Sequence, residues 1–146
     1  MSGKYPALLA RRADAMLTLA EELLHRGLHD LAVLNAEYAA QLHVKALLYR
    51  VTGEEWRGHS IRQLLGVLAL MLRRQGLAGE AERVEDFVKA YRRHLAELEE
   101  AHVRAVYGVF EYSEEQARLL LDTAKRVVEL VKQLTRTIFG QPPEGV

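Results

Sequence analysis

Three polar residues recur at every fourth position in a stretch of the chain that is otherwise apolar. The stretch is LNAEYAAQLHVKALLYR, residues 34–50, and the three residues are Glu37, Gln41 and Lys45. Residues four apart share one face of a helix, so an acid, an amide and a base would form a single polar row. Together they offer hydrogen-bond acceptors, hydrogen-bond donors and a positive charge along one line.

Two interpretations of this row remain open. In the first, the row is the solvent-exposed stripe of a helix, supported by contacts between neighbours four apart. The stem of Lys45 would then cover apolar surface while its ammonium group reaches water. In the second, the row lines a cleft where another helix, another subunit or a ligand supplies the complement. Asn35 and Tyr38 would lie close to such a cleft.

Signatures of catalysis and of metal binding are scarce elsewhere in the chain. No GxSxG, P-loop, GxGxxG or HExxH motif occurs. The absence of cysteine excludes disulfides and thiolate ligands. Glu99 and His102 have the Glu-x-x-His spacing of di-iron bundles, but no second such pair exists. We therefore expect no metal and no cofactor.

The elements that must position these residues are helices, because helical periodicity runs through nearly the whole chain and no strand pattern occurs. Ser60 and Ser113 each precede a glutamine by three residues, a spacing typical of helix caps. The predicted fold class is all-α, an antiparallel up-and-down bundle of about five helices. These cover about residues 5–26, 30–51, 60–76, 79–101 and 113–140. No linker or repeat divides residues 1–146, so we expect one domain with a core at about 5–138 and a short tail at 140–146.

Two of the expected helices are more apolar than a surface helix of a monomer. The helix at 30–51 is apolar on more than one side, which favours a central position. In the helix at 60–76, Val67, Leu70 and Met71 extend the apolar surface beyond one stripe. We expect these three residues to form a subunit interface, and a symmetric homodimer is the common form of such contacts.

Charge and composition narrow the partners and the compartment. The formal net charge is +0 and no basic patch stands out, so there is no DNA-binding signature. The N-terminus lacks the apolar core of a signal peptide, and no run of about 18 apolar residues exists. We therefore expect a cytoplasmic protein without membrane contact. A single asparagine, with arginine and glutamate dominating the charged residues, suggests a thermophilic source.

Two long stretches of the chain resemble the HEPN domain, named for higher eukaryotes and prokaryotes nucleotide-binding. The first is GLHDLAVLNAEYAAQLHVKALLYRVTG followed by GHSIRQLL, in which a small-residue helix ends in Lys45-Ala46-Leu47-Leu48 and His59 precedes a leucine-rich helix. The second is LEEAHVRAVYGVFEYSEEQARLLLDTAKRVVELV, with a tyrosine-containing turn before an alanine-rich helix. The resemblance covers about residues 11 to 135.

The resemblance implies an all-helical bundle that is commonly a homodimer. Members frequently work beside a small nucleotidyltransferase, often in toxin–antitoxin or other defence pairs. Many are metal-independent ribonucleases that use an Arg-x4-6-His motif near the start of the last helix. Others lack this motif and are expected to bind nucleotides or to serve as partner subunits.

The chain departs from the ribonuclease pattern at the positions that matter for catalysis. No arginine precedes any of the six histidines by the required spacing. Val106 stands where the family has an arginine, with Arg104 two residues earlier, and Gln41 stands where an acidic residue is frequent. An arginine–histidine pair supplies acid–base and electrostatic catalysis. We therefore predict a non-catalytic protein that binds a nucleotide or a nucleotidyltransferase partner, as in a toxin–antitoxin pair.

The predicted ligand site lies where the polar row faces the turn before the last helix. Lys45 and Arg104 would meet phosphate, because both are cationic donors. Glu37 and Gln41 would contact ribose or base, and Tyr107 would stack on a base.

Several alternatives accompany this prediction. His59 either contacts the ligand or holds the Ser60 cap in place. The chain could instead be an atypical metal-independent ribonuclease that uses Arg104 with His102 or His59. It could also be a purely structural dimeric adaptor that docks through the helix at 60–76.

Overall fold

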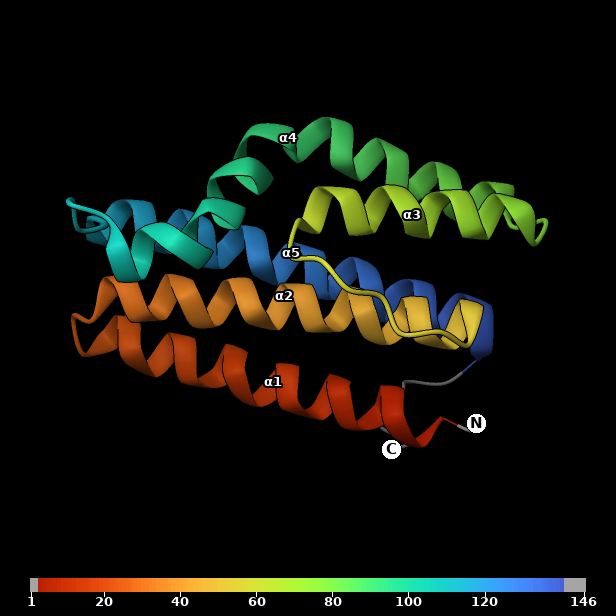
Figure 1. Cartoon of the computed structure of the whole chain (residues 1–146), viewed down its shortest axis with the longest axis horizontal. Coiled ribbons are helices and arrows are strands. Elements are labelled where there is room, and N and C mark those ends of the chain that lie inside the picture. Colours follow the sequence, from red (N-terminus) through yellow and green to blue (C-terminus); the bar gives the residue numbers. More distant parts are fainter. Residues whose placement is uncertain (1–2, 141–146) are drawn as a thin grey trace.

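The protein consists of five helices joined by short segments (Figure 1), as described by a computed structural model that covers residues 3–140. Within these residues there is no strand, so the predicted all-α fold with five helices is confirmed. The expected tail at 140–146 lies outside the described residues except for Gly140. The helices are α1 (Lys4–His25), α2 (His29–Thr52), α3 (Ile61–Arg74), α4 (Ala78–Tyr107) and α5 (Glu114–Phe139).

Helix α2 is the central helix, as its apolar sequence predicts. It packs against all four other helices, with α1 on one side and α3 and α4 on the other (Figure 1). Small side chains make close approach possible, because Ala32, Ala36 and Ala40 have no exposed surface. A helix surrounded by protein must bury whatever polar residues it carries, and this decides the environment of the polar row.

The connection between α2 and α3 departs from a simple hairpin. Gly53 ends α2 in the left-handed conformation, with φ of 77°. The chain then runs back along α2 without regular structure up to Ser60, so that α3 begins near the middle of the bundle (Figure 1). As a result α3 points in the same direction as α2. The other consecutive pairs, α1–α2, α3–α4 and α4–α5, are antiparallel. We call residues 54–59 the return segment.

Helix α4 is longer than predicted and bent. The prediction ended it near residue 101, which was wrong, because the helix continues to Tyr107 and Gly108 ends it. Its backbone leaves helical geometry at Tyr91, with φ of −113° and ψ of 19°, and Figure 1 shows the bend. The bend lets α4 contact α3 along its first part and also reach α2 and α5.

The outer face of α3 is less exposed than its sequence suggests. Val67 and Met71 are partly buried and pack against the core, whereas Leu70 is 47% exposed. Packing against α4 accounts for much of the apolar surface of α3. The subunit interface predicted for these three residues stays a prediction.

Polar contacts also fix the ends and the sides of the bundle. Ser60 and Ser113 cap α3 and α5 as predicted, and Ser113 forms a complete capping box with Gln116. In the interior, His43 Nε2 lies 2.8 Å from Asp14 Oδ1, which joins α2 to α1. No helix within residues 3–140 is both long enough and apolar enough to cross a membrane.

Candidate functional site

The polar row of α2 lies inside the protein. Glu37 is 0% exposed and Gln41 is 2% exposed, so the solvent-stripe interpretation is wrong for both. Lys45, one turn further along, is only partly buried. The row therefore runs from the interior toward the surface, and its inner members need partners from neighbouring elements.

Two histidines from distant parts of the chain supply these partners. The amide Nε2 of Gln41 donates to Glu37 Oε2 at 2.8 Å, and His102 Nδ1 of α4 lies 3.3 Å from Glu37 Oε1. His59 Nδ1 of the return segment lies 3.3 Å from Gln41 Oε1. The two oxygens that take no part in the Glu37–Gln41 bond, Glu37 Oε1 and Gln41 Oε1, thus each meet an imidazole ring.

The two imidazole rings also stack on each other. The ring centroids of His59 and His102 are 4.7 Å apart, with 20° between the ring planes. The ring of Tyr38 also packs on His102, with ring centroids 5.2 Å apart. We call Glu37, Gln41, His59 and His102 the histidine–carboxylate cluster.

Burial sets the proton affinities in and beside this cluster. Burial raises the pKa of Glu37, and the negative charge of Glu99 adds to this, while the hydrogen bonds from Gln41 and His102 and the charge of His102 act against it. Burial lowers the pKa of Lys45, and the charge of Glu37 partly offsets that effect.

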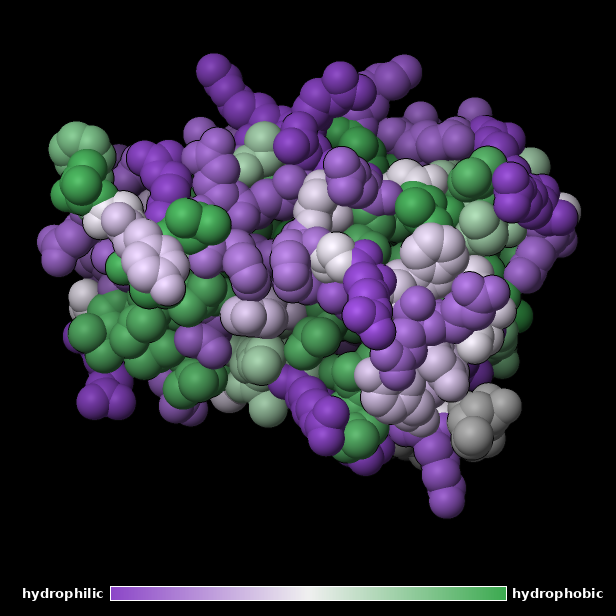
Figure 2. All heavy atoms as spheres, viewed as in Figure 1, coloured by the Kyte–Doolittle hydropathy of each residue, from purple (hydrophilic) through white to green (hydrophobic). Residues whose placement is uncertain are grey.

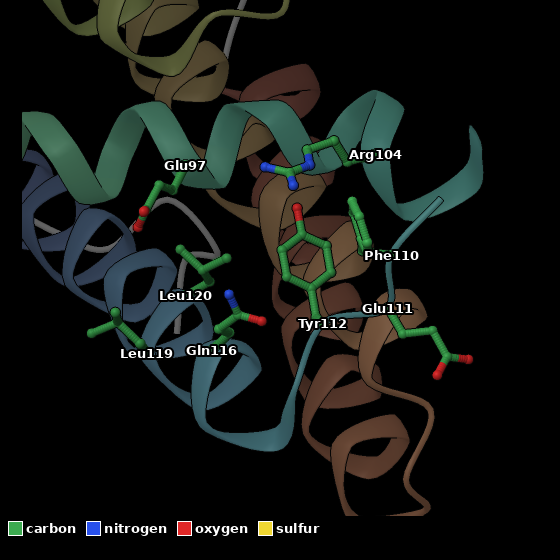
Figure 3. Close-up of a pocket in the computed structure, with 8 residues that line it drawn as sticks. All are labelled: Glu97, Arg104, Phe110, Glu111, Tyr112, Gln116, Leu119 and Leu120. Atoms are coloured by element: carbon green, nitrogen blue, oxygen red, sulfur yellow. The ribbon is translucent and has the colours of Figure 1, made fainter. Parts of the chain in front are cut away.

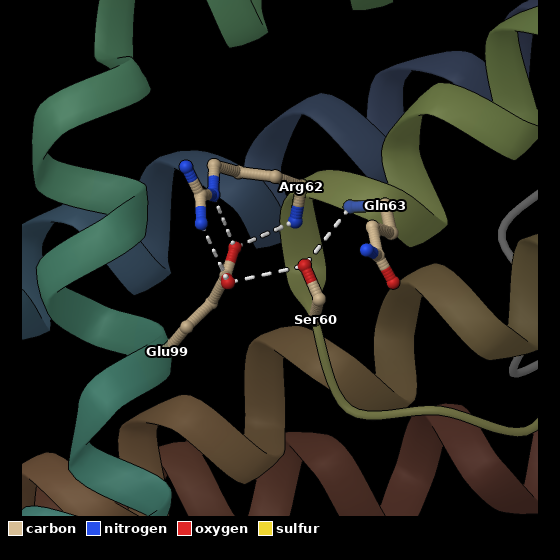
Figure 4. Close-up of polar contacts among 4 residues, drawn as sticks. All are labelled: Ser60, Arg62, Gln63 and Glu99. Carbon is tan, nitrogen blue, oxygen red and sulfur yellow. Dashed lines mark hydrogen bonds and ion pairs between the residues drawn. The ribbon is translucent and has the colours of Figure 1, made fainter.

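Glu99 links α4 to the start of α3 beside the cluster (Figure 4). Its carboxylate accepts from the Ser60 hydroxyl at 3.0 Å and from the backbone N–H of Arg62 at 2.8 Å. The guanidinium of Arg62 donates to the same group, with Nε at 2.9 Å from Oε2. A carboxylate is favourable at a helix N-terminus, so Glu99 fixes the end of the return segment. Glu99 and His102 therefore serve different partners, despite their Glu-x-x-His spacing.

A surface pocket opens next to His59, where the return segment crosses α1 and α2. Its volume is about 370 Å³, and its lining combines aromatic, cationic and polar side chains. We call it the aromatic pocket, and its lining residues are Tyr5, Leu9, Leu42, Lys45, Tyr49, Glu55, Trp56, Arg57, Gly58 and His59. Among the residues that the structure describes, Lys45 and Arg57 have neither an ion pair nor a hydrogen bond to a side chain.

The three aromatic rings of the pocket are fixed by contacts around it. Tyr5 and Tyr49 meet edge to face with ring centroids 5.1 Å apart. The indole Nε1 of Trp56 donates to Thr52 Oγ1 at 3.1 Å, which holds the ring near the end of α2. Burial and the neighbouring carboxylate of Glu55 raise the pKa of Tyr5. All three rings keep part of their surface exposed, so a planar ligand can reach them.

Arg104 lines a different pocket from Lys45. That pocket has a volume of about 310 Å³ and lies between the end of α4, the turn before α5 and the start of α5 (Figure 3). The guanidinium of Arg104 donates to Glu100 Oε1 at 3.0 Å and points toward the hydroxyl of Tyr112. This hydroxyl is buried and has no hydrogen-bond partner among the described residues.

The predicted site is therefore only partly assembled. Lys45 and His59 share the aromatic pocket, whereas Lys45 and Arg104 cannot meet one phosphate because they line separate pockets. The reason is the extra length of α4, which turns Arg104 toward the segment before α5. Tyr107 is 80% exposed and lines neither of these pockets.

The remaining two predicted contacts also change. Glu37 and Gln41 are buried behind the aromatic pocket and hydrogen-bond each other, so they reach a ligand only through His59. His59 does not bond to the Ser60 hydroxyl, which instead donates to Glu99.

Sequence reasoning missed the aromatic side of the pocket. Trp56 and Arg57 lie in TGEEWRGH, between the helices expected at 30–51 and 60–76, and neither is among the predicted site residues. A tryptophan beside an arginine between two glycines is a signal that could have been used, because exposed loops often carry binding residues. Tyr5 and Tyr49 gave no such signal, since both fall within helical periodicity.

Comparison with known proteins identifies the family. The model of the HEPN domain matches residues 7–134, which is most of the chain. The chain therefore belongs to the HEPN domain family. Comparisons with curated proteins and with solved structures gave no significant match.

Proposed function

We propose that this HEPN protein is a non-catalytic nucleotide-binding protein and that the nucleotide occupies the aromatic pocket. The observation that carries the proposal is the meeting of Trp56, Tyr49 and Tyr5 with Lys45 and Arg57 around one cavity. Stacking on an aromatic ring suits any nucleobase, and cationic side chains suit phosphate. Few other ligands need both kinds of contact within so small a space.

The lack of acidic partners for Lys45 and Arg57 within the described part of the chain supports this assignment. Some basic side chains elsewhere on the surface are already paired with acids, as in Arg62–Glu99 and Arg104–Glu100. Lys45 and Arg57 lack such a partner among the described residues, so a phosphate would meet charges that are not already neutralised. Burial of the Lys45 stem reduces the entropy that it would lose on binding.

The separation of Arg104 from His59 and His102 also supports the proposal that a single chain has no ribonuclease site. His102 faces Glu37 and His59, whereas Arg104 faces Glu100 and the turn before α5. An acid–base group and a charge-stabilising group must meet at the same phosphate. Arg104 does not meet either histidine of the cluster, so the alternative ribonuclease lacks an assembled site in the single chain.

Calorimetric titration with ATP, GTP, CTP and UTP tests the proposal. We expect Kd in the micromolar range for at least one of them, near −8 kcal/mol. The Lys45→Ala variant should weaken binding about tenfold or more, because a charge-assisted contact is lost. Lys89→Ala is the matched control, since Lys89 is exposed and lies outside the aromatic pocket. Equal affinities of both variants and of the wild type would refute the placement of the site.

A specific surface supports a second role, in assembly. Five hydrophobic side chains at the end of α4 and in the turn after it are each more than half exposed: Val103, Val106, Tyr107, Val109 and Phe110. We call them the end surface. Figure 2 shows hydrophobic residues gathered at that end of the molecule, over the α1–α2 turn and the end of α4. Exposed apolar patches of this kind usually mark interaction sites.

We propose that a second copy of this chain covers the end surface, in keeping with the homodimer that the family resemblance implies. Exposed Arg104 and Glu111 lie in the same stretch, so the apolar members would form the core of such an interface and the charged residues its rim. A small nucleotidyltransferase is the alternative occupant. Purified protein that stays monomeric at high concentration would favour the latter.

A further inference from the structure

The buried carboxylate of Glu37 fixes the orientation of the Gln41 amide. The hydrogen bond runs from Gln41 Nε2 to Glu37 Oε2 at 2.8 Å, so the NH2 group of Gln41 faces the carboxyl group. The amide oxygen of Gln41 must then point the other way, and it lies 3.3 Å from His59 Nδ1. An oxygen without a proton requires a donor opposite it.

The same logic fixes the tautomer of His59. Since Gln41 presents an oxygen, Nδ1 of His59 carries the proton and Nε2 is left as a bare acceptor in the neutral ring. Nε2 makes no hydrogen bond within residues 3–140, and the ring is exposed and lines the aromatic pocket. His59 therefore offers an acceptor to whatever occupies the pocket or to solvent.

His102 reinforces this arrangement from the other side. Its Nδ1 faces the Glu37 carboxylate, so it too donates through Nδ1. Its ring stacks on His59 at 4.7 Å and holds the plane of that ring. A 180° turn of the His59 ring would keep the stack but would place a carbon where Nδ1 now meets Gln41, and that hydrogen bond would be lost.

We propose that Glu37 and Gln41 are positioning residues that make His59 a hydrogen-bond acceptor in the aromatic pocket, so that the ligand presents an N–H or O–H donor to it. This inference rests on the proposed nucleotide-binding function and narrows its ligand. In a nucleotide, such a donor comes from a ribose hydroxyl or from an exocyclic amino group of the base. A base that shows only a carbonyl at that point would leave His59 without a partner and would be disfavoured.

The tautomer itself is measured without any ligand. Nitrogen–proton correlation spectra of the imidazole rings, recorded on the wild-type chain at neutral pH, distinguish the two neutral tautomers. We expect the Nδ1–H form for His59. In Gln41→Met, a substitution of similar volume, the preference for this form should be lost. An Nε2–H form of His59 in the wild type would overturn the proposed positioning of His59 by Glu37 and Gln41, whatever the protein binds.

Ligand selectivity is tested by titration with matched nucleotides. ATP and CTP carry an exocyclic amino group where ITP and UTP carry a carbonyl, and 2′-deoxy and 3′-deoxy forms of ATP each remove one ribose hydroxyl. We expect one of these changes to weaken binding about three- to tenfold. The change that does so identifies the source of the donor.

The variant His59→Phe keeps a stacking ring, removes the acceptor and lies at an exposed position. It should abolish the discrimination while binding persists through Lys45. Wild-type protein that binds all these nucleotides equally, or prefers the carbonyl forms, overturns the inference and leaves the proposed function standing. Protein that binds none of them overturns the proposed function. The tautomer measurement then still tests whether Glu37 and Gln41 position His59.

Discussion

Glu37 Oε2 accepts a 2.8 Å hydrogen bond from Gln41 Nε2 at a point of α2 where both side chains are sealed from solvent. A carboxylate in such a place is costly unless it is paired and hydrogen-bonded. The stacked histidines of the return segment and α4 complete its partners. An acid, an amide and a base recur along α2 because two of them hold distant elements together and the third reaches the surface pocket.

The raised pKa of Glu37 predicts how stability depends on pH. A group whose pKa is raised in the folded state favours folding below its unfolded value, about 4.5, and that contribution is lost as pH rises through the folded pKa. The free energy of unfolding of the wild type, relative to Glu37→Gln, should therefore fall as pH rises above about 4.5. The fall reflects the cost of ionising a carboxyl group that burial has removed from water. Urea denaturation across the pH range measures it, and a constant difference would contradict the burial of this charge.

Asp14 predicts a dependence of the opposite sign. Burial alone would raise its pKa, but the hydrogen bond and charge of His43 and the charge of Lys132 lower it overall. Its contribution to stability is present above its unfolded value of about 3.8 and is lost as pH falls through the folded pKa. Asp14→Asn should therefore lose most stability at neutral pH and least in acid. Asp86→Asn is the control, since Asp86 is exposed and should show no such trend.

Much of the fold could be predicted from the sequence. The number of helices, the caps at Ser60 and Ser113 and the central place of α2 follow from apolar periodicity and cap spacing, which are local signals. The end of α4 could not, because residues 102–107 are mostly exposed and lack a clear apolar stripe. Only Gly108 marks the end of α4. The aromatic residues that follow it make this glycine look like part of a longer irregular segment.

The site could be predicted only in part. Lys45 and His59 were identified and do share one pocket. The burial of Glu37 and Gln41 depends on His59 and His102, which are distant in sequence, and on the return segment running backward along α2. No local pattern encodes that path. The same path brings Trp56 to the cavity that Tyr49 also lines, and spacing alone does not reveal this pocket.

The placement of the site predicts that Arg104 is dispensable for nucleotide binding. Arg104 lies in the pocket beside Tyr112, away from the aromatic pocket. Arg104→Ala should leave nucleotide affinity unchanged within about twofold, whereas Arg57→Ala should weaken it several-fold through loss of a cationic contact. Parallel titrations of the two variants decide between the pockets. The reverse order of effects would move the ligand to the end of α4.

The end surface predicts which substitution separates subunits. Phe110 is 75% exposed, and a buried charge at an apolar interface is strongly unfavourable. Phe110→Asp should convert a dimer to monomer in sedimentation velocity, with helix content unchanged. Leu70→Glu tests the interface predicted on α3, where Leu70 is the most exposed of the three residues. If only Leu70→Glu yields monomers, α3 forms the contact and the end surface is free for another partner.

Trp56 permits the most direct test of nucleotide binding in the aromatic pocket, because it is the only tryptophan of the chain and it lines that pocket. The measurement is tryptophan fluorescence during titration of the wild type and of Lys45→Ala with the nucleotide that gives the largest calorimetric signal. We predict a saturable change in the wild type with the same Kd as calorimetry, and a weaker affinity in Lys45→Ala. Calorimetric binding that leaves the fluorescence of Trp56 unchanged would contradict the account, because the ligand would then occupy another part of the protein.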